Sequence, residues 1–421
     1  MKYLLQNMSE SSKKFIYFLA MACVAAVVIY YEASMNMQNL TTYLFSYRYG
    51  FIPRGFVGTI IDGLLSLFGL ELTYFKCLCI SGVATAGYYI LLFILYALFL
   101  GKVMEKAQSA LKALMVFFSW FAFTEFISWN NFGRTDEYLT ILVIMALILL
   151  VMEQAEWLIV PICAVAVMVH SGFTFTNSGL ILALLLYKAI CAFQMEKRGE
   201  KPTRTFRYYM IILILSFAVI SALFLYFQVF RQAVSMDVYD HIKEEAIRVA
   251  SEGDQGGYLV QLQSLIDSEL LRMDVYDFES QWRAVNVREF PIFVVLFMPY
   301  IIILIRFAIR VFKKANDRLD IFKYIVPFIG VATILPDLLL KVDYGRWVFC
   351  IILYYCLMVM TAAALDDEPV LEAMTETYEW LKAHKICWLL LVYPVLFVPF
   401  RDVSISDLTL KLMNLIFGYY V

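Results

Sequence analysis

Long apolar runs recur along almost the whole chain, and they constrain its fold more than any other feature. A helix that crosses about 30 Å of hydrocarbon at 1.5 Å per residue needs roughly 20 apolar residues. Apolar residues make up 62% of the 421 residues and charged residues only 17%, whereas a soluble domain has about 25% charged residues. We therefore expect an all-α, polytopic integral membrane bundle. About eleven transmembrane helices are expected, at 15–31, 76–100, 113–129, 138–152, 157–170, 178–194, 208–230, 291–311, 322–340, 346–365 and 386–400.

One long polar segment separates two expected membrane modules. Residues 1–230 would form an N-terminal module of about seven helices, with a further interfacial helix near 55–70. Residues 291–421 would form a C-terminal module of about four. Between them, 231–290 has two amphipathic stretches, 236–251 and 258–272, on either side of a glycine-rich break. This pattern predicts an extracytoplasmic helical hairpin, either simply solvated or forming a cap over a site.

Lysine and arginine are distributed unevenly between the two sets of loops. If the N-terminus is inside, the inner loops hold basic pairs such as Lys197-Arg198 and Lys313-Lys314, and the short outer loops hold few basic residues. Basic loops tend to stay in the cytoplasm, so a cytoplasmic N-terminus is predicted. The net charge of −2 argues against a nucleic-acid partner and leaves the lipid bilayer as the first expected one.

The first outer loop carries arginines beside a glycine-rich helix start. Arg48 and Arg54 precede Gly55, which opens a stretch whose polar residues recur at helical spacing. A helix N-terminus favours anions, and an arginine fork there suits a phosphate or diphosphate. Gly55 would also allow a ligand to approach closely. The simpler alternative is that both arginines reach out to lipid headgroups.

The second outer loop concentrates charge next to two apolar helices. Glu125 lies near the end of one predicted span, and Arg134, Asp136 and Glu137 lie at the start of the next. Charges beside the membrane are energetically unfavourable, which makes a catalytic role for these acids reasonable. The alternative is a local ion pair with a helix cap, and the residues favour neither interpretation.

Two further outer segments add candidates. His170 is the one histidine predicted near the outer mouth of the bundle and could act as a base, although a histidine at a helix end is more often a hydrogen-bonded cap. Asn177 follows it as a supporting polar residue. Asp343 and Arg346 are spaced for a local ion pair, or Arg346 could form a second anion clamp.

Arginines, carboxylates and a histidine over a wide apolar bundle suit a lipid-linked anionic substrate. The apolar tail would stay in the bilayer while its phosphate meets Arg54, Arg134 or Arg346. A carboxylate or His170 could accept the proton of an incoming hydroxyl, and arginine would stabilise the departing phosphate. These residues favour glycosyl transfer from a polyprenyl phosphate or diphosphate sugar. The alternative is a transporter or flippase of a lipid-linked saccharide or other anionic substrate, which more often has ionisable groups at mid-membrane.

The motifs Gly50 to Gly58, Arg134 to Glu137, His170 and Asp343 to Trp347 resemble those of bacterial capsule and O-antigen polysaccharide polymerases. These proteins belong with the C-type membrane glycosyltransferases. The resemblance implies surface polysaccharide synthesis at the outer face of the bacterial cytoplasmic (inner) membrane, with arginines holding the diphosphate and a large loop over the site. Other envelope polysaccharide assembly proteins would then be partners. The chain departs from the pattern in 231–290, which has no paired-arginine motif.

No cofactor is expected. The sequence has only three histidines and no paired Cys/His spacing, which argues against a structural zinc site. A metal-dependent C-type enzyme would need acidic residues in its first loop, where Glu32 is the one ready candidate for a divalent metal. Metal-independent chemistry is therefore favoured.

Overall fold

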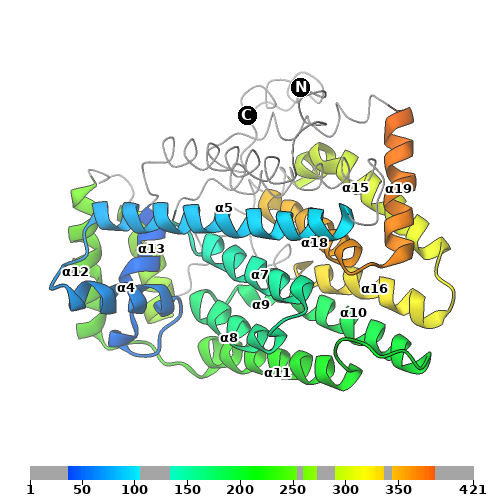
Figure 1. Ribbon diagram of the computed structural model, residues 1–421. Helices are drawn as coiled ribbons and strands as arrows, with labels where there is room; N and C mark the ends of the chain where they lie inside the picture. Colours follow the sequence, from blue (N-terminus) through cyan, green and yellow to red (C-terminus); the bar gives the residue numbers. More distant parts are fainter. Residues whose placement is uncertain (1–36, 105–132, 254–258, 273–289, 336–343, 385–421) are drawn as a thin grey trace. The chain divides into compact units, whose positions relative to one another are not determined.

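The computed structural model describes residues 37–104, 133–253, 259–272, 290–335 and 344–384. Every regular element within these ranges is a helix, and none is a strand (Figure 1). The prediction of an all-α chain is confirmed for this part of the sequence. The expected spans 15–31, 113–129 and 386–400 lie outside the described residues.

Four described helices are long and apolar enough to cross a membrane. They lie in α5 (Tyr74–Met104), α7 (Thr135–Met152), α10 (Ser178–Lys197) and α11 (Phe206–Leu225), the last extended by a π-helical turn to Phe230. A fifth span results if α18 (Tyr344–Ala364) and α19 (Glu368–Ala383), which are bent by 120°, count as one. The spans predicted at 76–100, 138–152, 178–194 and 208–230 match these four helices. The total of eleven remains a prediction.

The predicted spans 157–170 and 322–340 correspond, in their described residues, to helices shorter than these four, and 291–311 corresponds to a long helix that is not among them. The helix α8 (Ile159–Val169) has 11 residues, about 17 Å at 1.5 Å per residue, which is too short to span the hydrocarbon alone. It folds back on α7 through left-handed residues Glu153 and Ala155. The helix α15 (Phe290–Lys313) has 24 residues and becomes basic only in its last third, so the span predicted at 291–311 stays a prediction. The helix α16 (Arg318–Ala332) has 15 residues with an internal proline.

The described helices belong to two compact units that do not follow the order of the chain. Unit 1 takes the described parts of Met1–Leu98, Asn131–Thr174 and Leu215–Val275, and unit 2 takes those of Phe99–Asn130, Phe175–Ile214 and Tyr276–Val421. The predicted boundaries at 230 and 290 instead divide the chain by polarity. The difference arises because packing groups segments by contact: residues 215–275 join the N-terminal part of the chain in unit 1.

Unit 1 contains the predicted interfacial helix and the predicted hairpin. Residues 37–49 form short turns, η1 (Met37–Leu40), α3 (Thr41–Leu44) and η2 (Tyr47–Tyr49), ahead of α4 (Gly55–Leu67). The hairpin consists of α12 (Met236–Glu252) and α13 (Leu259–Leu271), close to the predicted 236–251 and 258–272. Both helices bury apolar residues at helical spacing: Tyr239, Ile242, Ala246, Val249 and Ala250 in α12, and Leu262, Ile266 and Leu270 in α13.

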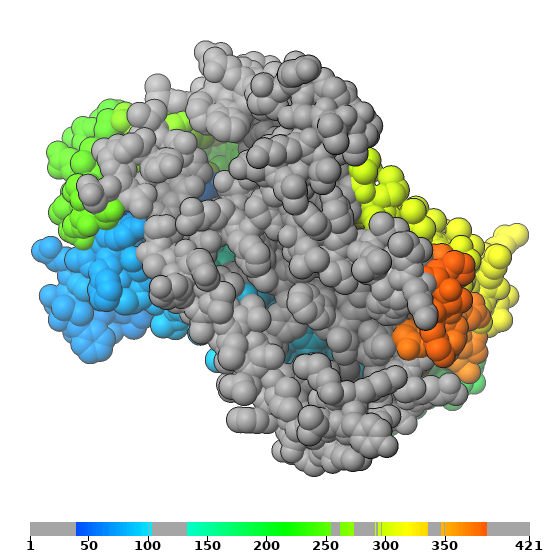
Figure 2. Space-filling model, turned by 90° about the horizontal axis from the view of Figure 1, so that it is seen from above, coloured from blue at the N-terminus to red at the C-terminus, as the bar shows by residue number. Residues whose placement is uncertain are grey.

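The buried stripes of the hairpin face the N-terminal part of the same unit. The helix α12 packs against α3, and α13 packs against η1 and α3. In Figure 2 the green atoms of the hairpin lie against the blue atoms of the chain before residue 100. The hairpin is therefore docked on residues 37–72.

Glycine allows α4 to pack directly on the backbone that precedes it. A Cβ atom on Gly58 would lie 2.0 Å from the carbonyl oxygen of Phe45 and 2.8 Å from that of Tyr43. Because backbone atoms cannot move aside easily, Gly58→Ala is expected to destabilise the chain by about 1–3 kcal/mol, the usual effect of overpacking. Thermal unfolding in detergent measures the loss.

Gly63 of the same helix is the matched control, because a Cβ atom there would have nothing within 4 Å. Gly63→Ala is expected to be neutral or stabilising by up to about 1 kcal/mol. Equal unfolding temperatures for the two variants would contradict the close packing of α4.

Unit 2 is built on α10, α15, α16, α18 and α19. The helices α10 and α16 pack at a pair of small residues, since a Cβ atom on Gly179 would lie 2.0 Å from the carbonyl oxygen of Gly330. At the start of α19, Asp367 accepts hydrogen bonds from Tyr187 and Tyr324 at 2.6 and 2.8 Å. Lys323 Nζ donates to the same carboxylate at 2.8 Å. This buried polar group ties three helices together.

Candidate functional site

A polar cleft lies in unit 1, between the segment 43–72 and α12. Its volume is about 520 Å³, within the range of small-molecule sites. The helix α4 contributes its polar face, with Asp62 and Ser66, and leaves Ile60 and Leu64 exposed on the other side, as the helical spacing predicted. The charged and imidazole side chains that line the cleft are Arg48, Asp62, Glu71, His241, Glu244, Glu245 and Arg248.

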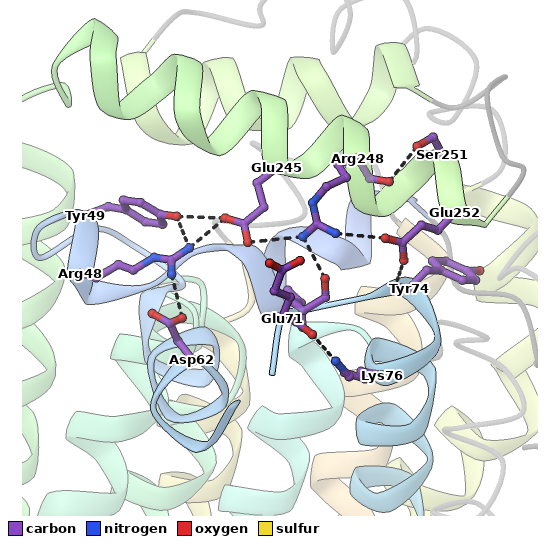
Figure 3. A network of polar contacts seen from close by, with 11 residues as sticks. Arg48, Tyr49, Asp62, Glu71, Tyr74, Lys76, Glu245, Arg248, Ser251 and Glu252 are labelled. Atoms are coloured by element: carbon purple, nitrogen blue, oxygen red, sulfur yellow. Dashed lines mark hydrogen bonds and ion pairs between the residues drawn. The ribbon is translucent and has the colours of Figure 1, made fainter. Parts of the chain in front are cut away.

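Arg48 connects the first loop to α4 and to α12 (Figure 3). Its Nη1 atom donates to Asp62 Oδ1 at 2.9 Å, and its Nη2 atom donates to Glu245 Oε2 at 2.8 Å. Tyr49 OH donates to the same Glu245 oxygen at 3.0 Å. Burial and the neighbouring Glu245 carboxylate raise the pKa of Tyr49 to about 12, so its hydroxyl stays a donor at neutral pH. The predicted phosphate ligand Arg48 is thus held between two carboxylates.

Arg248 makes the second half of this network. It donates to Glu252 Oε1 at 3.0 Å and to the carbonyl oxygen of Leu72 at 2.9 Å, and it lies 3.9 Å from Glu245. Glu252 in turn accepts from the backbone N–H of Tyr74 at 2.9 Å. The spacing of Glu245, Arg248 and Glu252 places all three on one face of α12. This face attaches the hairpin to the first loop and to the start of α5.

Loss of the Glu245 charge is expected to loosen the hairpin. Glu245→Gln leaves Arg48 and Arg248 without their shared carboxylate, but Arg48 is 44% exposed, so solvent screens much of the effect. We expect hydrogen exchange of α12 amides to accelerate about twofold to tenfold. Asp240→Asn, at an exposed position of the same helix, is the control. Equal exchange in the two variants would mean that the network does not hold the hairpin.

A second group of charges surrounds Glu269 of α13. Arg54 Nη2 lies 3.1 Å from Glu269 Oε1, and Arg231 Nη2 donates to the carbonyl oxygen of Glu269 at 2.6 Å. Arg272 donates to the carbonyl oxygens of Arg231 and Gln228 at 2.8 and 2.7 Å. Arg54 therefore pairs with the Glu269 carboxylate, while Arg231 and Arg272 are held close by through backbone carbonyl oxygens. We call Arg54, Arg231 and Arg272 the arginine cluster.

Arg231 is the most unusual member of the arginine cluster. Its side chain is buried, with 7% exposure for the residue, yet its Nε and Nη1 atoms have no hydrogen-bond partner in the part of the chain that the structure describes. Burial lowers the pKa of Arg231 below its ordinary value, an effect that Glu269 only partly offsets. An arginine nevertheless stays charged at neutral pH. The Nε and Nη1 atoms of Arg231 are thus two buried, charged donors without an acceptor among the described residues, an arrangement that costs free energy.

Arg54 occupies the N-cap of α4. Its backbone is left-handed, with φ 60°, and its side chain makes no capping bond. Gly55 next to it lies against the ring of Tyr47, which a Cβ atom would approach to 2.6 Å. The predicted helix start is confirmed. The glycine makes room for this ring, where a ligand had been expected.

The charges of the second outer loop are paired at the start of α7. Arg134 Nε lies 2.7 Å from Asp136 Oδ2, and the helix begins at Thr135 with Asp136 and Glu137 in its first turn. Glu137 is 3% exposed and accepts from Thr85 Oγ1 at 2.7 Å. These contacts match the local-pair interpretation. The next residue of α7, Tyr138, is connected to the polar cleft. Its hydroxyl group lies 3.2 Å from that of Tyr43, and Tyr43 lines the cleft.

His170 is the C-cap of α8. Its Nδ1 atom accepts from the backbone N–H of Gly172 at 2.7 Å, so the neutral ring carries its proton on Nε2. In this tautomer Nε2 donates and cannot accept a proton. The geometry favours a capping role over the predicted base. The neighbouring Ser171 accepts from Gln228 at 3.0 Å, which connects this turn to the residues around the arginine cluster.

The remaining candidates lie elsewhere. Asn177 belongs to unit 2, where it bonds to Tyr354 and Thr176. Arg346 falls in the first turn of α18, and its side chain is not among those described. Glu32, Glu125 and Asp343 lie outside the described residues. Within the described residues no three His, Cys, Asp or Glu side chains are grouped to hold a metal ion.

Sequence reasoning found one side of this site and missed most of the other. It selected Arg48 and Arg54 but not their partners Glu245 and Glu269, which follow about 200 residues later. The sequence of α12 does contain a signal for these partners: Glu245, Arg248 and Glu252 recur at helical spacing and so lie on one face of the helix.

Neither a scan of protein-family models nor searches of curated proteins and of solved structures finds a match to this chain. Function is therefore inferred from the geometry of the site and the chemistry of its residues.

Proposed function

We propose that this chain is a membrane glycosyltransferase or polymerase acting on polyprenyl-phosphate- or diphosphate-linked sugars, at the outer face of the bacterial cytoplasmic membrane, in surface polysaccharide synthesis. The observation that carries the proposal is the arginine cluster beside the polar cleft. One carboxylate, that of Glu269, pairs with Arg54, while Arg231 and Arg272 donate to backbone carbonyl oxygens. Two N–H groups of the buried Arg231 lack an acceptor among the described residues. A phosphate or diphosphate supplies such acceptors in a geometry that arginine matches.

The distance between the two parts of the site supports the same substrate. Arg54 and Asp62 are eight residues apart along α4, about 12 Å at 1.5 Å per residue. A ligand with its phosphate at Arg54 can therefore extend its saccharide into the polar cleft. The apolar candidate spans provide a surface for the polyprenyl chain. Each chemical part of a lipid-linked sugar thus has a matching environment.

The reaction follows from these positions. An acceptor hydroxyl oxygen bonds to the anomeric carbon while the bond from that carbon to the phosphate oxygen breaks. The arginine cluster stabilises the negative charge that builds on the departing phosphate. The hydroxyl proton passes to a carboxylate, for which Asp136 is a better candidate than Glu137, because the side chain of Glu137 is buried and accepts from Thr85. The tautomer of His170 suits this role less well.

Mass spectrometry of lipid co-purified with the protein tests the proposal. The expected result is a polyprenyl-linked saccharide that lengthens by repeat units when the purified protein is incubated with more of it. A lipid-linked saccharide that crosses a vesicle membrane without lengthening would favour the transporter or flippase. Absence of any lipid-linked saccharide, together with no elongation of supplied substrate, would exclude the glycosyltransferase.

A further inference from the structure

The polar cleft is lined by more carboxylates than arginines, unlike the arginine cluster. Arg48 and Arg248 line it together with Asp62, Glu71, Glu244 and Glu245. Two cations against four carboxylates leave the lining with two net negative charges, leaving His241 aside. The cleft, with its volume of about 520 Å³, is therefore acidic. This is the opposite of what an anionic ligand would require.

The two arginines of the cleft are already committed. Arg48 is shared between Asp62 and Glu245, and Arg248 between Glu252 and the carbonyl oxygen of Leu72. An anionic ligand would have to displace carboxylates that are part of the same docking network. Figure 3 shows both guanidinium groups surrounded by protein oxygen atoms.

Two carboxylates of the cleft are available to a ligand. Within the described ranges, the side chains of Glu71 and Glu244 make neither a hydrogen bond nor an ion pair. An ionised carboxylate only accepts hydrogen bonds, and it does so most strongly from hydroxyl or ammonium donors that need a partner. The ring of His241, stacked near Tyr49 at 5.8 Å, adds a flat amphipathic surface to the same wall.

We infer that the polar cleft binds the saccharide through Glu71 and Glu244 and selects sugars without acidic groups, either neutral or amino sugars. This inference rests on the proposed function for its biological setting, but the binding can be measured without turnover. Hydroxyl groups donate to the two free carboxylates, an ammonium group gains from the negative lining, and a uronic acid is repelled by it. Specificity here comes from the repulsive element as much as from the attractive one.

Three disaccharides of one backbone test the selectivity on the full chain in lipid nanodiscs. Cellobiose is neutral, chitobiose with free amino groups is cationic, and cellobiouronic acid is anionic. Saturation-transfer NMR titrations are expected to give cellobiouronic acid an affinity at least about tenfold weaker than that of cellobiose, and chitobiose an affinity at least equal to it. The difference should shrink in high salt, because ions screen charges about 10 Å apart at 0.1 M ionic strength.

Variants assign the effect to the two carboxylates. The double variant Glu71→Gln with Glu244→Gln is expected to remove most of the discrimination against cellobiouronic acid, whereas Asp237→Asn, on α12 but outside the cleft lining, leaves it unchanged. Equal affinity of the native chain for the neutral and anionic disaccharides would overturn the inference, as would no binding of any of the three. Preserved selectivity without lipid-linked elongation would instead support the cleft and exclude the proposed enzyme.

Discussion

Arg54→Ala is expected to lower the rate of glycan extension roughly 30-fold to several thousandfold. Removal of one member of a largely buried, hydrogen-bonded charge pair typically weakens an interaction by about 2–5 kcal/mol. Arg54 is 17% exposed at its side chain and lies at the start of α4, where it would meet the phosphate of the substrate. Arg54→Lys keeps the charge but loses the planar fork, so an intermediate rate is expected. Extension of a purified lipid-linked substrate, followed by mass spectrometry, measures the effect.

Glu269→Gln is expected to act in the opposite direction on binding. It removes the carboxylate that now pairs with Arg54, so the affinity for a polyprenyl phosphate should rise while that for the matching neutral polyprenol does not change. Arg231→Ala should lower the same affinity, because it removes the two buried donors without partners. Arg198→Ala, in an exposed turn of unit 2, is the control. Normal extension by both Arg54→Ala and Arg231→Ala, with normal polyprenyl phosphate affinity, would contradict the role of the arginine cluster.

The individual helices were predictable because their signals are local. The apolar residues of α12 and α13 recur at helical spacing, and a glycine-rich break lies between the two stretches. The start of α4 was likewise predictable from Arg54-Gly55. The spacing of Asp62 and Ser66 predicted which face of the helix is polar. In each case the observed bounds lie within a few residues of the expected ones.

The partners across the site could not be predicted, because nothing local encodes them. Arg48 meets Glu245 at a separation of 197 residues, and many acids of 231–290 would have matched it equally well. The capping role of His170 depends on one ring nitrogen and the backbone of Gly172, which no spacing rule distinguishes from a base. The span predicted at 157–170 was already short, and its helix α8 has only 11 residues, after left-handed residues Glu153 and Ala155 that separate it from α7.

Charge in this chain serves two physical purposes that composition does not separate. In the polar cleft, carboxylates outnumber arginines, and two of them make neither a hydrogen bond nor an ion pair with the described residues, whereas the arginine cluster holds three arginines and the one carboxylate of Glu269. Opposite local charges about 12 Å apart on α4 suit a ligand that is anionic at one end and rich in hydroxyl groups at the other. A uniform basic surface would attract lipid headgroups but would not orient such a ligand.

Asp367→Asn is expected to destabilise unit 2 by about 3–5 kcal/mol, the effect of leaving a buried charge without its partner. Asp367 and Lys323 are 8% and 6% exposed, and the ammonium group would retain the more distant carboxylate of Asp320, at 3.8 Å, and the faces of the Tyr324 and Tyr187 rings. Glu372→Gln, which removes an exposed carboxylate of α19, should change stability by less than about 1 kcal/mol. Thermal unfolding in detergent compares the variants.

The double variant Lys323→Met with Asp367→Asn separates the buried charge from the hydrogen bonds around it. It is expected to be more stable than Asp367→Asn alone, because no unpaired ammonium group stays buried, although two residues are changed. The asparagine still offers an oxygen to Tyr187, Tyr324 or the backbone N–H of Val370, so the start of α19 keeps part of its cap. If the double variant unfolds at a lower temperature than the single one, the ammonium group of Lys323 is not unfavourable in the absence of the Asp367 charge, which would contradict the buried-charge explanation.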